Sequence, residues 1–218
     1  MKLNTEINNI KNENIHLKNE NFQLKNEVIE LKEKLNILWK ENKMIINLES
    51  KIIKDNAKYY ESLKNWINPT KKIKAEILYR LSENGDKYST FHELCDNKGP
   101  TLTLFHVNNG NIVGIYTPLS WDTTSGRKED MDTFIFNLNK NQKYKKLIAD
   151  LSIYCGKSYG PLTADFGCNF NKSMKIIKHY ANLNINEYYD KGSEILPSNN
   201  DKKVYDLIET EVYKIIIE

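Results

Sequence analysis

The chain has 218 residues, enough for one domain of ordinary size and an extension. Its 28% charged and 39% hydrophobic residues, with 9 glycines and 5 prolines, are typical of a folded protein and exclude a collagen-like or Pro/Gly-rich disordered chain. The net charge is only +3, with 12 basic against 10 acidic residues in 1–67 and 20 against 19 in 68–218, so neither part has the basic surplus typical of nucleic-acid-binding proteins.

The sequence shows no sign of membrane insertion or secretion. No apolar run approaches the roughly 18 residues of a spanning helix, and residues 1–6 lack the apolar core of a signal peptide. The 3 cysteines are an odd count without paired spacing, so we expect reduced thiols. These features predict a protein of the cytosol or nucleus.

The first 67 residues predict a coiled-coil dimerisation arm. Every seventh residue from Leu3 to Trp66 is apolar, the pattern of position d in a heptad repeat. The column four residues later is position a, where Asn14 and Asn21 favour a parallel, in-register dimer. The residues expected to form the seam are Ile10, Asn14, Leu17, Asn21, Leu24, Val28, Leu31, Leu35 and Leu38.

Charged residues flank this seam in the order that a parallel dimer requires. Glutamates at positions g would pair with lysines five residues later at positions e of the other chain: Glu6 with Lys11, Glu13 with Lys18, Glu20 with Lys25, and Glu27 with Lys32. A lone helix would leave the leucine column in water, so a dimer is favoured. No basic helix precedes Leu3 in the sequence, so we expect an oligomerisation device rather than a DNA-reading zipper.

Past Trp39 the charge pattern decays and the apolar stripe widens, so this segment either packs against the following domain or forms a higher oligomer. Pro69 biases its predecessor out of the helical region and predicts the boundary between the arm (1–67) and a second domain (72–218). In that domain we expect helices at 71–83 and 89–95, a hairpin of strands 101–107 and 112–117, and further strands at 133–138, 147–154, 174–180 and 204–217. Helices followed by antiparallel strands predict an α+β domain.

The spacing of reactive residues gives catalysis little support. His92 and Cys95 would share one helix face, but no second ligand pair at metal-binding spacing accompanies them, so structural cysteines are favoured over a zinc site. The carboxylates Glu129, Asp130 and Asp132 indicate a solvated loop. We therefore expect no catalytic residue, no cofactor and no metal, and retain Cys95 as the candidate redox thiol.

The second domain contains an ordered series of motifs: Ile77-Leu78-Tyr79-Arg80, Phe91-His92 with Cys95-Asp96, and the segments 98–104, 114–121, 132–138, 159–161 and 208–213. Over about residues 74–218 this series resembles the TLDc domain family of oxidation-resistance proteins. The resemblance implies an antiparallel β-sandwich edged by helices, preceded here by the long parallel coiled-coil helix.

The resemblance also implies a role in protection against oxidative stress, and some animal relatives bind the proton-pumping vacuolar ATPase. The favoured interpretation is a non-enzymatic interaction or scaffold protein that forms a homodimer through 1–67 and binds an unidentified protein partner, with the vacuolar ATPase as one candidate. Two alternatives stay open. One is a dimeric DNA-binding or transcriptional regulator of the stress response, and the other is a redox sensor that depends on Cys95.

Overall fold

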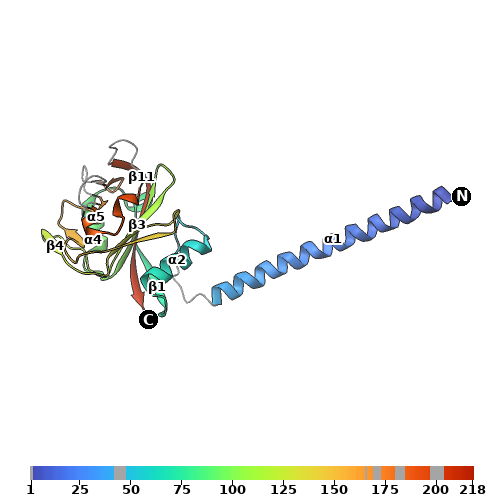
Figure 1. The fold of residues 1–218 in the computed structure, drawn as a ribbon, viewed down its shortest axis with the longest axis horizontal. Coiled ribbons are helices and arrows are strands. Elements are labelled where there is room, and N and C mark those ends of the chain that lie inside the picture. Colours follow the sequence, from blue (N-terminus) through green and yellow to red (C-terminus); the bar gives the residue numbers. More distant parts are fainter. Residues whose placement is uncertain (1, 42–47, 165, 169–172, 180–184, 197–203) are drawn as a thin grey trace. The chain divides into compact units, whose positions relative to one another are not determined.

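The computed structural model describes residues 2–41, 48–164, 166–168, 173–179, 185–196 and 204–218 (Figure 1). The chain divides into two compact units, Met1–Met44 and Ile45–Glu218. The first unit is the helix α1 (Lys2–Glu41). The boundary therefore differs from the one predicted near Pro69, and the helical arm is shorter than the predicted 1–67.

The second unit contains all other elements (Figure 1). Its helices are α2 (Ala57–Ile67), α3 (Leu81–Asn84), α4 (Tyr88–Cys95), α5 (Ile185–Tyr188) and the 3-10 helix η1 (Gly192–Glu194). Its strands are β1 (Ile73–Arg80), β2 (Thr101–Val107), β3 (Ile112–Thr117), β4 (Gly126–Lys128), β5 (Phe134–Asn137), β6 (Gln142–Lys145), β7 (Ile153–Cys155), β8 (Leu162–Thr163), β9 (Phe166–Gly167), β10 (Ile176–His179) and β11 (Val204–Ile217).

Among the described residues, nine strands form one curled antiparallel sheet. Its order is β6-β5-β3-β2-β11-β10-β9-β8, and β1 also pairs with β11. The 14-residue strand β11 connects the two parts of this sheet: its first residues pair with β10, and its later residues pair with β2 and β1. The strands β4 and β7 form a separate two-stranded sheet. The predicted α+β class is confirmed.

Most of the predicted elements are present. The hairpin of β2 and β3 has the predicted bounds, and α4, β5, β10 and β11 lie where a helix and three strands were expected. The predicted strand at 147–154 is reduced to β7, and β4 lies directly before the acidic residues for which a solvated loop was expected. Asn68, directly before Pro69, has the extended backbone expected of a residue that precedes proline, and it ends α2.

The predicted helix at 71–83 is wrong for most of its length, because residues 73–80 form the strand β1. Ile73 and Ala75 are buried while Lys74 and Glu76 are exposed, which is the two-residue period of a strand. The apolar residues at 73, 77 and 81 also fit a helical period, so the sequence pattern was ambiguous. Pairing with β11 favours the strand over the helix, since β11 supplies hydrogen-bond partners for the backbone N–H and C=O groups of β1.

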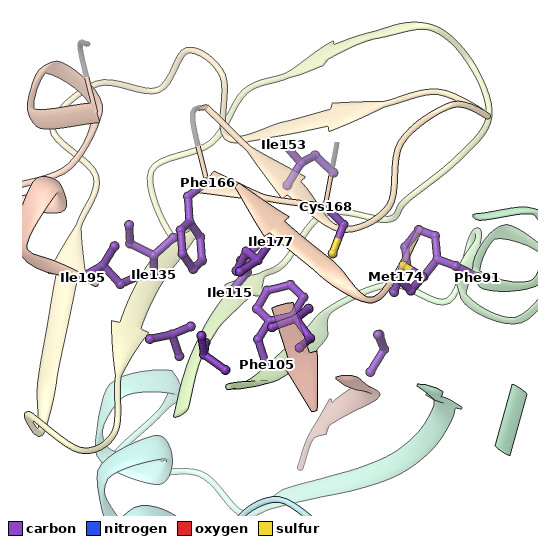
Figure 2. Packing of buried hydrophobic residues seen from close by; sticks show 14 of the residues in the cluster. Phe91, Phe105, Ile115, Ile135, Ile153, Phe166, Cys168, Met174, Ile177 and Ile195 are labelled. Atoms are coloured by element: carbon purple, nitrogen blue, oxygen red, sulfur yellow. The ribbon is translucent and has the colours of Figure 1, made fainter. Parts of the chain in front are cut away.

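One face of the sheet carries the main hydrophobic core. Phe105, Ile115 and Ile135, on three neighbouring strands, lie around Phe166, and the helix residue Phe91 belongs to another part of the same cluster (Figure 2). Phe105 and Phe166 meet edge to face with ring centroids 6.1 Å apart. These contacts bring together residues from the middle and the end of the domain.

The opposite face is covered by the segment 48–67. Phe136 alternates with the core residue Ile135, so it points to this second face, and its ring lies 5.8 Å from that of Trp66 in α2. Ser62 of α2 donates to Asn141 Oδ1 at 2.6 Å, just before β6. The segment 48–67 therefore belongs to the folded domain. Of the two alternatives given for the residues after Trp39, this is the one in which they pack against the following domain.

Candidate functional site

The apolar column of α1 is exposed in the single chain. Leu17 and Leu24 are 54% and 57% exposed, and the other described members of the seam at positions a and d are exposed as well. Leu35 and Leu38 lie in α1, but their side chains fall outside the described residues. The helix thus presents a continuous apolar surface that a second helix could cover.

The two seam asparagines are anchored on their own helix. The Nδ2 atom of Asn14 donates to the carbonyl oxygen of Ile10 at 3.1 Å, and that of Asn21 to the carbonyl oxygen of Leu17 at 3.0 Å. Both bonds hold the amides along the apolar column. This is the position from which an amide can meet the same amide on an aligned partner.

The lysines at position e have no carboxylate within reach on their own helix face. Residues three and four positions away from Lys11, Lys18, Lys25 and Lys32 are all asparagine or apolar residues. Two intrahelical pairs occur among the described residues of α1, between Glu30 and Lys34 at 2.6 Å and between His16 and the position-g residue Glu20 at 3.6 Å. The lysines at position e are therefore arranged for carboxylates of another chain, whereas Glu20 also has a neighbour on its own helix.

Cys95 lies at the end of α4 with no exposed surface. Burial raises the pKa of its thiol, so the reactive thiolate is disfavoured in the folded protein. Cys155 and Cys168 are also free and buried, and burial raises the pKa of both thiols. This environment argues against the candidate redox thiol.

His92 is engaged away from Cys95. Its Nδ1 lies 2.8 Å from Asp96 Oδ1, and its Nε2 lies 2.9 Å from the carbonyl oxygen of Tyr159 and 3.1 Å from that of Gly156. The ring therefore ties α4 to the loop that follows β7. No group of three His, Cys, Asp or Glu side chains suited to a metal ion occurs in the described part of the chain.

The acidic loop 129–132 also has a structural role. Asp130 Oδ1 accepts hydrogen bonds from the backbone N–H groups of Asp132 and Thr133 at 2.6 and 2.7 Å. These bonds close the turn that leads into β5. The carboxylate of Asp130 thus shapes this turn.

A charged cluster that the sequence did not predict is centred on Glu211. This carboxylate has no exposed surface and accepts from Ser50 Oγ at 2.6 Å, Arg80 Nε at 2.9 Å, the N–H of Lys51 at 2.9 Å and Tyr213 Oη at 3.0 Å. Burial opposes the charge of Arg80, but its hydrogen bonds to Glu211 and to Glu83 raise the pKa of the guanidinium above its usual value. Arg80 also donates to the carbonyl oxygen of Glu49 at 2.6 Å, so the cluster fastens the start of segment 48–67 to β1 and β11.

Comparison with protein families gives one match to most of the chain. A family model described as the TLDc domain matches residues 46–216. The match begins at the second structural unit and includes the segment 48–67 that covers the sheet. No curated protein matches the chain. None of the described helices is long and apolar enough to span a membrane.

Proposed function

The chain belongs to the TLDc domain family, and from that membership we propose a non-enzymatic interaction protein of oxidative-stress protection. In this proposal α1 pairs two copies in parallel, and each TLDc domain binds a protein partner. The observation that carries the pairing is the exposed heptad column of α1 together with the position-e lysines, which have no carboxylate three or four residues away on their own helix. The vacuolar ATPase is one candidate partner, suggested by the family resemblance alone.

Light scattering on the full chain tests the pairing. We expect the mass of a dimer at low micromolar concentration, and a monomer after Leu17→Gln combined with Leu24→Gln, since these changes remove two seam leucines while keeping a good helix former. The control His16→Gln with Gln23→Ala changes exposed residues away from the column and should leave the dimer intact. A monomeric unmodified chain would refute the pairing.

The absence of catalysis is part of the proposal. It is supported by the buried thiols and by the structural engagement of His92 and Asp130. Pure protein with a thiol reductant should not consume peroxide catalytically, and iodoacetamide should label Cys95 only after unfolding in urea. Turnover that is lost in Cys95→Ser, or rapid labelling of Cys95 in the folded protein, would favour the redox alternative.

DNA binding by a dimeric regulator has less support. The domain carries nearly equal numbers of basic and acidic residues. Tight DNA binding requires a local surplus of lysine and arginine that neutralises the phosphates. A gel shift near physiological salt distinguishes this alternative. A tight complex with one duplex sequence that resists excess random DNA would make the regulator the better interpretation.

A further inference from the structure

The helix α1 carries a second apolar column that the predicted seam does not use. Ile15, Phe22 and Ile29 lie seven residues apart at position b of the heptad, and they are 58%, 66% and 56% exposed. A dimer formed through positions a and d would leave these three side chains in water. Large apolar side chains repeated along one face of a helix indicate a contact surface.

The position of this column allows two helix contacts at once. Each residue of a helix turns by about 100°, so the column at b lies about 160° around the helix from the leucines at d. A helix that packs there approaches from the face opposite the seam and does not compete with it. Because both columns repeat every seven residues, both follow the same supercoil.

The flanks of the column show which orientation a second copy would take. The column at e on one side contains Lys18 and Lys25, and the column at f on the other side contains Asn19 and Asn26. Two parallel helices in contact through b would place the lysines of one beside the asparagines of the other, at nearly equal height. Two antiparallel helices would instead place lysine beside lysine, which is unfavourable.

We propose that Ile15, Phe22 and Ile29 form a second self-association surface, through which parallel dimers pack side by side in the same direction. The inference rests on the proposed dimer and adds to it a higher assembly of four or more domains, because each dimer carries this surface on both of its sides. Three side chains from each helix cover less than the roughly 800 Å² per partner of a stable interface. The association of dimers is therefore weaker than the dimer itself and depends on protein concentration.

Sedimentation equilibrium on the full chain over a wide concentration range tests the assembly. The mass of the unmodified protein should rise from dimer to tetramer and then higher as the concentration increases, while Phe22→Gln should remain a dimer, with dimer–dimer association at least tenfold weaker. Glutamine keeps the helix propensity and removes the largest apolar side chain of the column. The control His16→Gln lies outside the e, b and f positions and should behave as the unmodified chain.

A dimer mass that stays constant at all concentrations would overturn the proposal, as would unchanged association in Phe22→Gln. A monomer mass at all concentrations would instead refute the proposed dimer on which the inference rests. The two failures are thus distinguished by mass alone.

Cross-linking tests the orientation. Ile15→Cys in such a parallel assembly faces its own copy in the neighbouring dimer, so mild oxidation should produce disulfide-linked chains on a non-reducing gel, and Ile29→Cys should behave in the same way. Residues at b point away from each other within one dimer, and the native cysteines are buried, so neither supplies this product. Cross-links that form only when the two variants are mixed, or no cross-links at all, would overturn the parallel arrangement.

Discussion

The carboxylate of Glu211 illustrates the balance that a buried charge requires. Removal from water costs several kcal/mol unless hydrogen bonds and an opposite charge replace the lost solvation. The hydroxyls of Ser50 and Tyr213, the N–H of Lys51 and the guanidinium of Arg80 supply these interactions. The cost of the buried pair is therefore offset only while both partners are present.

Glu211→Gln should lower the free energy of unfolding by about 3–5 kcal/mol, since it leaves the Arg80 charge buried without its main partner. Urea denaturation measures the change. Glu83→Gln removes the other carboxylate beside Arg80, but the Glu83 side chain is 50% exposed, so this substitution should lower the free energy of unfolding much less than Glu211→Gln. Equal effects of the two substitutions would show that burial does not determine the strength of this pair.

Among the elements of the domain, the segment 48–67 has a different role from the one the sequence suggested for 1–67 as a whole. Leu48, Ile53 and Leu63 are almost completely buried, and so are Ile52 and Tyr60. Burying a large apolar side chain contributes roughly 1.5–3 kcal/mol, so the five together contribute about 7–15 kcal/mol, as much as the whole stability of an ordinary domain. We therefore expect the TLDc domain to need this segment in order to fold.

Two truncations should therefore differ sharply. The fragment 45–218 should unfold in one cooperative thermal transition, whereas 72–218 should lack a cooperative transition because it exposes the face of the sheet that carries Phe136. Circular dichroism during heating measures both. Equal melting temperatures for the two fragments would place the domain boundary near Pro69 after all.

The sequence predicts those elements whose signals are local. The hairpin of β2 and β3 follows from an Asn-Gly turn between two β-rich runs, and the a and d columns of α1 follow from a seven-residue period. The strand β1 and the pair of Arg80 with Glu211 depend on contacts between distant residues, 131 positions apart for that pair. No local pattern distinguishes Glu211 from the other glutamates, so the cluster it forms is visible only in the folded chain.

At the scale of the whole molecule, we expect the helix α1 to determine how many TLDc domains one assembly contains. Each domain is expected to fold without α1. The domain has its own core and its own N-terminal cover, and the compact unit that contains both begins after Met44. Changes in the seam of α1 should therefore alter the oligomeric state without lowering the melting temperature of the domain. This separation allows the seam to be tested in the intact chain.

Replacing both Asn14 and Asn21 by Leu should make the arm more stable to heat but less specific in oligomeric state. The two amides lower the stability of an apolar seam and select two aligned parallel helices, so leucine in their place permits trimers, tetramers and shifted registers. The substitutions are best made together with Phe22→Gln, which removes the contribution of the second apolar column. Sedimentation velocity should then show a mixture of species, whereas Phe22→Gln alone gives one dimer peak. A single sharp dimer peak in the combined variant would show that the flanking Glu and Lys pairs, rather than the asparagines, select the dimer.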